Sequence, residues 1–377
     1  MALVVLGGCT IYTACPTDQA PPPPPANTGG SSNGGTTNLG GEGGSDTGGL
    51  AEPTGTWKNE TYDLVDFDSE CGNVSYLSAR PDEDELIVGI ARHGLLHKTS
   101  AAKEWTPIGQ GAGSAKITNR ANSFVFDPDH PDTYWESGIY NGGGVYRTDD
   151  GGDTFIDLGI MHNDVVSVDF SDPDRQVLLA SGHEQLHKLY KSTDGGESWT
   201  EIGDKLPDEV TVCPNPLVLD ASTYLLGCWG FSDGQKGIWR TTDGGDTWAQ
   251  VSDIGGGTVP LVASDGRIYW VGESLDGIVR SDDDGKTWQG PYLSGETAFV
   301  NPIELPDGRI AIVARQHVIT SSNHGETWKV ASSGLDFDPN GVAYSAAGNA
   351  FYVWHWDCDE SVPEDAVMSY ELDDETE

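Results

Sequence analysis

A short pattern that repeats through most of the chain constrains its fold more than any other feature. Three copies read Ser/Thr-x-Asp-x-Gly-x-Ser/Thr-Trp, and the first of them is STDGGESW at 192–199. Two variants end at Phe155 and Trp328, and a degenerate copy ends at Trp105. The closing aromatic residues stand at 105, 155, 199, 248, 288 and 328, so successive copies are 40 to 50 residues apart. This period is typical of the blades of a β-propeller.

The residues of the pattern suit a tight turn between two strands. A short Asp or Asn side chain accepts hydrogen bonds from backbone N–H groups, glycine adopts positive φ, and the hydroxyl residues add further turn hydrogen bonds. The residues at the third position are Asp150, Asp194, Asp243, Asp283 and Asn323. Because the turn uses all of these groups itself, we expect them to be structural.

The pattern resembles the Asp-box, or BNR repeat, of sialidases, sortilin-type receptors and xyloglucan-cleaving propellers, and the resemblance covers most of residues 57–370. It implies an all-β propeller in which each box lies between the third and fourth strands of a blade, away from the ligand-binding face. Residues 57–377 number 321, and at about 45 residues per blade they predict seven four-stranded blades.

The last blade lacks an outer strand of its own. Three strands are expected there, at 342–345, 350–356 and 366–372, and no fourth follows. The segment 58–65, which follows Trp57, has the pattern of the missing strand. We therefore expect this N-terminal segment to close the ring, since an uncovered sheet edge would otherwise remain.

The cysteines of the propeller predict two disulfides. Cys213 and Cys228 flank a predicted hairpin almost symmetrically, so they are expected to face each other across neighbouring strands. Cys71 and Cys358 are expected on the same rim of adjacent blades. Such pairs are typical of proteins that fold in an oxidising compartment.

The first 55 residues differ in composition from the rest. Residues 1–9 are a short apolar run that ends in Leu6-Gly7-Gly8-Cys9 and resembles the lipobox of bacterial lipoproteins, without the usual basic n-region. Residues 10–55, which are rich in Pro, Gly, Ser and Thr, predict a disordered tether. We therefore expect a propeller at 56–377 that is held through lipidated Cys9 at the bacterial outer membrane or cell surface.

The charge of the chain excludes one class of partner. Sixty acidic residues against 20 Lys and Arg give a net charge of -40, which repels nucleic acid and anionic lipid headgroups. We expect a monomer that contacts the membrane only through its lipid.

The string His183-Glu184-Gln185-Leu186-His187 has the HExxH spelling of zinc proteases. That motif binds zinc on a helix, where residues i and i+4 lie about 6 Å apart on one face. Strands are expected here at 177–180 and 188–192, so the string has room only for a loop. We therefore do not expect a zinc protease, and no cofactor is predicted. A metal site built from His162, His183 and His187 stays open as an alternative.

The same loop has a position of interest. In a propeller, the loops that join second to third strands share one face with the connections between blades, and ligands bind on that face. Each residue type expected there also occurs as an ordinary surface group, so the clustering carries the prediction. The residues expected there are Arg92, His93, Arg120, Tyr140, His162, His183, His187, Trp229, Arg315, His317 and His355.

Two functions fit this face. The first is a binding or assembly module for a glycan or a cell-surface protein, similar in plan to sortilin-type receptors. The alternative is a carbohydrate-active enzyme that acts on an acidic glycan. A glycoside hydrolase needs two carboxylates, and the candidates are Glu136, Asp164 and Glu184. A polysaccharide lyase needs an imidazole or tyrosine beside the uronate carboxyl, with arginine or a metal to neutralise that group.

A true sialidase is not expected. The resemblance would require an Arg-Ile-Pro signature near the start of the propeller, and the nearest string is Ala79-Arg80-Pro81. Arg267 and Arg309, which might complete an arginine triad, are expected on the opposite face.

Overall fold

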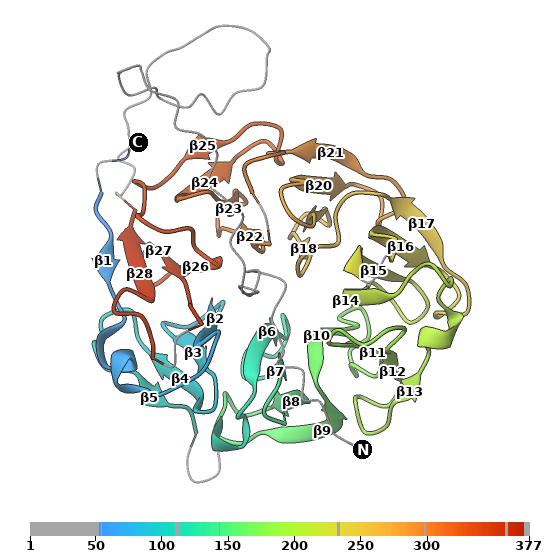
Figure 1. Cartoon of the computed structure of the whole chain (residues 1–377), viewed down its shortest axis with the longest axis horizontal. Coiled ribbons are helices and arrows are strands. Elements are labelled where there is room, and N and C mark those ends of the chain that lie inside the picture. Colours follow the sequence, from blue (N-terminus) through green and yellow to red (C-terminus); the bar gives the residue numbers. More distant parts are fainter. Residues whose placement is uncertain are drawn as a thin grey trace, which may run out of the picture. The chain divides into compact units, whose positions relative to one another are not determined.

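Four-stranded antiparallel sheets follow one another around a central axis, and the described residues contain seven of them (Figure 1). This computed structural model describes residues 53, 55–109, 114–142, 144–231, 234–297, 299–358 and 361–372. The arrangement is a seven-bladed β-propeller, so the all-β fold predicted from the repeat is confirmed. Cys9 and nearly all of the predicted tether at 10–55 lie outside the described residues.

Each of the first six blades runs outwards from the axis in chain order (Figure 1). Blade 1 contains β2 (Val74–Ala79), β3 (Leu86–Ile90), β4 (Gly94–Lys98) and β5 (Thr106–Pro107). Blade 2 contains β6 (Arg120–Phe126), β7 (Tyr134–Ile139), β8 (Gly144–Thr148) and β9 (Ile156–Met161). Blade 3 contains β10 (Asn163–Val168), β11 (Leu178–Gly182), β12 (Leu189–Ser192) and β13 (Thr200–Glu201).

The remaining blades complete the ring. Blade 4 contains β14 (Val212–Val218), β15 (Tyr224–Trp229), β16 (Gly237–Thr241) and β17 (Ala249–Ser252). Blade 5 contains β18 (Leu261–Val262), β19 (Ile268–Val271), β20 (Ile278–Ser281) and β21 (Gln289–Tyr292). Blade 6 contains β22 (Ile303–Glu304), β23 (Ile310–Ala314), β24 (His317–Ser321) and β25 (Lys329–Val330). Blade 7 contains β26 (Gly341–Ser345), β27 (Ala350–Trp354), β28 (Val367–Glu371) and β1 (Lys58–Asn59).

Helical structure in the described part is limited to short 3-10 turns. These are η1 (Tyr62–Asp66), η2 (Ser114–Lys116) and η3 (Gly203–Lys205). None of the described helices is long and apolar enough to cross a membrane.

The core lies mainly on the second strands of the blades. Every residue of β3, β11 and β27 is buried, whereas both residues of the outer strands β5, β13 and β25 are exposed. A second strand is covered on both faces by the neighbouring blades, so a continuous apolar run suits it better than alternation. The sequence LIVGI at 86–90 is such a run.

The repeated pattern forms turns between third and fourth strands, where the resemblance placed it. Ser192 Oγ accepts the N–H groups of Asp194 and Gly196, at 3.2 and 2.8 Å. The Asp194 carboxylate accepts the N–H of Ser198 at 2.9 Å, and in blade 6 the amide oxygen of Asn323 does the same for Thr327. The turn is thus closed by its own side chains.

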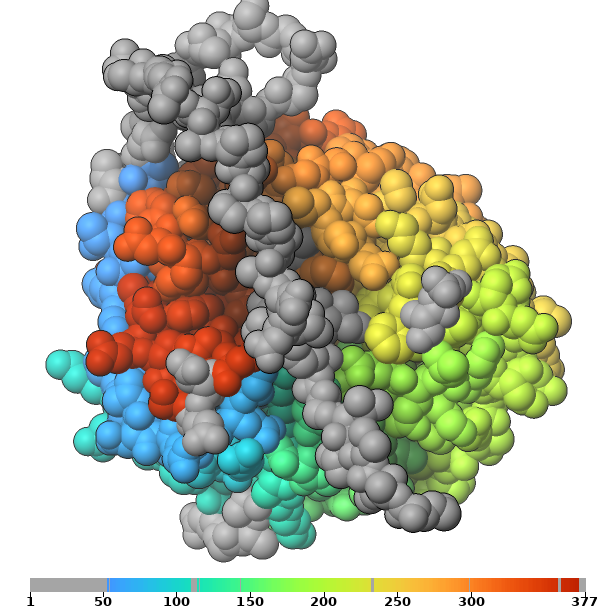
Figure 2. Space-filling view, viewed as in Figure 1, coloured from blue at the N-terminus to red at the C-terminus, as the bar shows by residue number. Residues whose placement is uncertain are grey.

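The N-terminal segment closes the ring as predicted, but with a shorter strand. β1 pairs antiparallel with β28, with Lys58 opposite Ser369, and the blue start of the propeller lies beside its red end in Figure 2. The expected strand at 58–65 ends at Asn59, because the chain then turns into the 3-10 helix η1 and buries Leu64. The ring of Trp57 packs against Tyr370 at a centroid distance of 5.2 Å.

Two disulfides lie in the described part, and they join the cysteine pairs expected from the sequence. Cys213–Cys228 links the neighbouring strands β14 and β15 of blade 4. Cys71–Cys358 joins the segment before blade 1 to the loop of blade 7, across 287 residues of sequence. The second bond therefore fastens together the first and last blades of the ring.

The two disulfides are expected to differ in their effect on stability. In the chain-entropy account, the stabilisation grows with the logarithm of the loop that the bond closes. The separations are 287 and 15 residues, so Cys71→Ala with Cys358→Ala should cost about 2–3 kcal/mol more than Cys213→Ala with Cys228→Ala. Urea unfolding of the two double variants measures the difference. Equal losses would show that the long-range bond does not act by constraining the unfolded chain.

Candidate functional site

The residues predicted to form a ligand-binding face all lie on one side of the propeller. Because each blade is an antiparallel meander, its second-to-third-strand loop emerges on the same side as the connection to the next blade. The predicted residues lie on these loops or at the strand ends that border them: Arg92, His93, Arg120, Tyr140, His162, His183, His187, Trp229, Arg315, His317 and His355.

The HEQLH string forms the loop between β11 and β12, and residues 183–188 contain no helix. The loop is fixed by its backbone: His183 N–H donates to His162 O at 2.9 Å, and His187 N–H donates to Thr211 O at 2.7 Å. The two imidazoles therefore start from opposite ends of a loop that is tied to blade 2 on one side and blade 4 on the other. The helical arrangement that a zinc protease needs is not formed.

Asp164, His183 and Tyr140 form a continuous hydrogen-bonded chain. The imidazole Nδ1 of His183 lies 2.7 Å from Asp164 Oδ1, and its Nε2 lies 3.0 Å from the hydroxyl oxygen of Tyr140. Since an ionised carboxylate only accepts, Nδ1 of His183 carries the proton. In the neutral imidazole, Nε2 then accepts the hydroxyl proton of Tyr140.

A β-bulge aims Asp164 at this imidazole. The register between β10 and β11 shifts between Asn163 and Val166, so three steps along β10 oppose two along β11. Such a bulge turns side chains away from regular alternation, and the first strands of blades 1, 2 and 4 have a similar register shift. Asp164 is only 3% exposed as a result, and His183 is 5% exposed.

His162 completes an aromatic cluster around this chain. Its Nδ1 accepts the backbone N–H of Tyr140 at 3.3 Å, which places its proton on Nε2. The ring centroids of Tyr140, His162 and His183 lie 5.1 to 5.3 Å apart, and the two imidazoles meet edge to face at 83°. We call Tyr140, His162, Asp164, His183 and Glu184 the Tyr140 cluster.

The cluster shifts its two imidazoles in opposite directions. Burial lowers the pKa of His183, but its hydrogen bond to Asp164 and the charges of Asp164 and Glu184 outweigh this, so the pKa is raised. Burial and the neighbouring His183 lower the pKa of His162. Two groups of one type with separated pKa values are typical of acid–base sites. Burial and Glu184 raise the pKa of Tyr140, whose hydroxyl thus stays neutral at physiological pH.

Charged groups of both signs border the cluster. The guanidinium of Arg120 stacks on the ring of Trp356 from blade 7, 4.6 Å from its centroid, and its charge opposes the increase in the pKa of both Tyr140 and His183. Glu70 accepts hydrogen bonds from Arg92 of blade 1 and Asn141 of blade 2. Glu184 Oε1 lies 4.0 Å from His183 Nε2, and its side chain is 27% exposed.

Several predicted residues do not join the cluster. Arg315 pairs with Glu296 at 2.6 Å, His355 stacks on Phe337 and contacts Asp365, and His317 contacts Ser332 O. His93 contacts Asp68 O, and Trp229 is 5% exposed and donates to Gly257 O. These side chains contact groups other than the members of the Tyr140 cluster.

The geometry does not support Glu136 as a catalytic carboxyl or a metal site at His162, His183 and His187. Glu136 is 0% exposed inside blade 2 and accepts a hydrogen bond from Asn119 at 2.8 Å, so no glycan can contact its carboxyl in this conformation. The metal alternative built on His162, His183 and His187 also lacks a site, because the described residues contain no group of three or more His, Cys, Asp or Glu side chains that could hold an ion.

The sequence indicated the members of the cluster. It did not indicate the hydrogen bonds that join them or most of the side chains that border them. Trp356, which borders the cluster from blade 7, follows His355 on the predicted ligand face, whereas nothing in the local sequence marks Glu70 and Asn141. Met161 and Leu186, 70% and 50% exposed, are adjacent to His162 and His187. Their apolar character on an exposed face was the one available signal.

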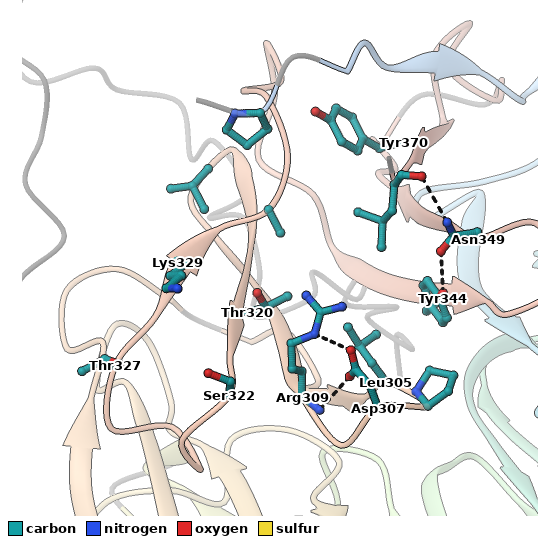
Figure 3. A pocket seen from close by; sticks show the side chains of 15 residues that line it. Leu305, Asp307, Arg309, Thr320, Ser322, Thr327, Lys329, Tyr344, Asn349 and Tyr370 are labelled. Carbon is teal, nitrogen blue, oxygen red and sulfur yellow. Dashed lines mark hydrogen bonds and ion pairs between the residues drawn. The ribbon is translucent and has the colours of Figure 1, made fainter. Parts of the chain in front are cut away.

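A cavity of about 760 Å³ lies between blades 6 and 7, whereas the Tyr140 cluster belongs to blades 2 and 3. Its walls come from the turns that link first to second and third to fourth strands, which emerge on the opposite face. Figure 3 shows two pairs of its polar side chains in contact: Arg309 donates to Asp307 at 2.6 Å, and Tyr344 donates to Asn349 at 2.9 Å. Because these groups are already paired, the cavity is the weaker candidate.

Comparison with known proteins gives the fold alone. No known family model matches the chain, and no curated protein matches it. A structure of YCF48 bound to D1 peptide is similar, with a TM-score of 0.53 and 12% identity, covering 86% of this chain and 99% of that one.

Two larger proteins contain a similar propeller. The extracellular domain of BT4673 from B. thetaiotaomicron has a TM-score of 0.53 and 8% identity over 80% of this chain. The GH74 xyloglucanase from Xanthomonas campestris has a TM-score of 0.50 and 15% identity over 83% of this chain. This chain spans 38% of the first and 55% of the second, so each of them is much longer than the propeller described above.

Burial makes the stability of the fold depend on the proton of Glu136. Burial raises the pKa of Glu136 to about 8, although the Asn119 hydrogen bond opposes the shift. The folded chain thus keeps a proton that the unfolded chain releases near pH 4.3. The unfolding free energy should therefore fall as pH rises from about 4 to about 8, and Glu136→Gln should remove this part of the fall.

Urea unfolding at a series of pH values measures the effect, with exposed Glu197→Gln as the matched control. Parallel pH profiles for the wild type and Glu136→Gln would show that the carboxyl ionises inside the folded blade.

Proposed function

We propose that this chain is an extracytoplasmic propeller of the Asp-box type that binds a glycan over blades 2 and 3. The Tyr140 cluster carries the proposal, because it gathers three rings, a buried hydrogen bond between His183 and Asp164 and a partly exposed carboxylate at one place on the loop face. Aromatic rings next to a few fixed hydrogen-bonding groups suit the apolar faces and hydroxyl groups of sugars.

The cellular location rests on two further features. The disulfides Cys71–Cys358 and Cys213–Cys228 suit an oxidising compartment. The lipobox-like run that ends at Cys9 and the tether that follows it would hold the propeller at the bacterial outer membrane or cell surface. The similar extracellular domain of BT4673 supports a propeller in such a place, at the level of the fold.

A protein ligand is the second candidate, and one observation favours it. Met161 and Leu186 are 70% and 50% exposed on the loop face, next to the cluster. Exposed apolar side chains beside polar groups are typical of protein interfaces. The structure of YCF48, which has a similar fold, contains bound D1 peptide. A peptide ligand is therefore compatible with a propeller of this kind.

The two ligands can be separated by two variants. Tyr140→Ala removes the central ring of the cluster, and Met161→Ser with Leu186→Ser removes only the exposed apolar pair. If the ligand is a glycan, Tyr140→Ala should lower the affinity about tenfold or more, whereas the double variant should leave it nearly unchanged. The affinity is measured by calorimetry against a panel of neutral and acidic polysaccharides.

The matched control is Ile156→Ser, because Ile156 is 46% exposed at the opposite end of β9 from Met161. Loss of polysaccharide binding in the double variant, with full binding by Tyr140→Ala, would place the glycan site away from the Tyr140 cluster. No binding of any polysaccharide by the wild type would contradict the glycan and leave the protein ligand.

A further inference from the structure

We propose that Asp164, His183 and Tyr140 form a proton relay that cleaves a uronate-containing polysaccharide by β-elimination. The inference rests on the proposed function, since the glycan must bind over the same cluster. It adds a reaction and a substrate class to a site that we have so far described only as a binding surface.

The geometry of a relay is present. The three groups are joined by hydrogen bonds of 2.7 and 3.0 Å, and exposure increases along them from Asp164 at 3% to His183 at 5% and then to partly exposed Tyr140. A proton taken up at the surface by the Tyr140 oxygen therefore has one defined path inwards. A tyrosine held only for packing would not need a histidine and a buried carboxylate behind its hydroxyl.

Three residues of the cluster have a left-handed backbone conformation. Tyr140, His162 and Glu184 have φ angles of 59°, 62° and 51°, in the left-handed region that side chains other than glycine rarely adopt. Each angle belongs to a different loop, and together they turn the three side chains towards one place. The same conformation occurs at Arg92 and Arg315, in the corresponding loops of blades 1 and 6, so it is a property of these loops that the cluster uses.

The carboxylates of the cluster fit elimination better than hydrolysis. Glycoside hydrolysis uses two carboxyl groups on either side of the scissile bond. Glu136 is fully buried and Asp164 is committed to His183, so Glu184 alone of the three candidates is exposed at this face. A tyrosine with a histidine behind it instead exchanges protons, and proton exchange is what elimination requires.

The reaction balances with the groups of the cluster. The Tyr140 oxygen takes the proton from the carbon next to the uronate carboxyl, while its own proton passes to His183 Nε2. The electrons of the broken C–H bond form a C=C bond, and the C–O bond to the neighbouring sugar breaks. The imidazolium, which Asp164 stabilises, returns its proton through Tyr140 to the departing oxygen. One glycosidic bond yields one unsaturated uronate and one hydroxyl end.

Arg120 supplies the positive charge that this reaction needs. Removal of a proton beside a carboxylate builds negative charge on that carboxylate, so a nearby cation stabilises the transition state. Arg120 is only 6% exposed and is stacked on Trp356, so it acts through its charge, which opposes the increase in the pKa of both Tyr140 and His183, and not through contact with the sugar. The chain as a whole carries a net charge of -40, which repels polyanions, so this local positive charge is the feature that would favour an acidic sugar at the cluster.

The test measures turnover and binding separately. The purified chain is mixed with pectate, alginate, hyaluronan, chondroitin sulfate and heparan sulfate, and the ultraviolet absorbance of unsaturated uronate is followed. We expect product from at least one of them. Tyr140→Phe removes only the hydroxyl, so it should lower turnover at least about 100-fold and leave affinity within a few fold. The matched control is Tyr190→Phe, on the third strand of blade 3.

Asp164 is a positioning residue, and its test is the pH profile of turnover. The charged and titratable groups around His183 are Asp164, Glu184, Arg120, Tyr140 and His162, from five different segments. Asp164→Asn removes the nearest negative charge. The acidic limb of the profile, which reports the neutral imidazole, should therefore move to lower pH. A lower rate with an unmoved profile would assign Asp164 a merely structural role and remove it from the relay.

The outcomes separate the two proposals. Binding of a uronate polymer without unsaturated product would overturn the relay and leave the binding function intact, and so would binding of neutral glycans alone. Full turnover by Tyr140→Phe would also overturn it. Failure to bind any glycan would contradict the proposed function, and the relay would fall with it.

Discussion

The propeller depends on the pairing of its first described segment with its last blade. β1 pairs with the outer edge of β28, which gives blade 7 the same four-stranded sheet as the other blades and joins the two ends of the ring in one sheet. The same segment reaches three blades. Trp57 Nε1 donates to Ser333 O of blade 6, and Glu60 accepts hydrogen bonds from Ser369 of blade 7 and buried Lys98 of blade 1. A few residues thus fix the relative positions of the blades at the closure, and the Cys71–Cys358 bond fixes the same junction.

A rigid ring is what allows a site to be assembled from separate blades. Tyr140 comes from blade 2, His162 from the connection, and Asp164 and His183 from blade 3. Hydrogen bonds of 2.7 to 3.3 Å among them tolerate little relative movement of the two blades. The repeated turns also hold neighbouring blades together, although they lie far from the cluster. A Cβ at Gly196 would lie 2.8 Å from the side chain of Leu158 of blade 2, so this turn of blade 3 packs closely on its neighbour.

The sequence was sufficient for the fold because the fold is periodic. A repeat of 40 to 50 residues predicted the number of blades, and the missing outer strand predicted the closure. It predicted the face of the site, since the alternation of strands fixes which loops lie together. It could not predict that Asp164 reaches His183, because that contact depends on a bulge in β10 and on left-handed backbone at neighbouring loops. Nor could it show that Glu136 is buried, since Glu in a strand is ordinarily exposed.

The HEQLH string illustrates how context decides the chemistry of a histidine. On a helix its two imidazoles would share one ion, but here the strand β11 ends at Gly182 and the backbone N–H groups of His183 and His187 donate to different neighbours, His162 O and Thr211 O. His183 lies at the corner where β11 leaves the sheet, so one nitrogen faces the buried Asp164 and the other faces the loop of blade 2. An imidazole held between a carboxylate and a hydroxyl suits proton transfer, and a metal ion would have to displace the Tyr140 hydroxyl to bind Nε2. The strand that precedes the string therefore excludes one function and creates the geometry for another.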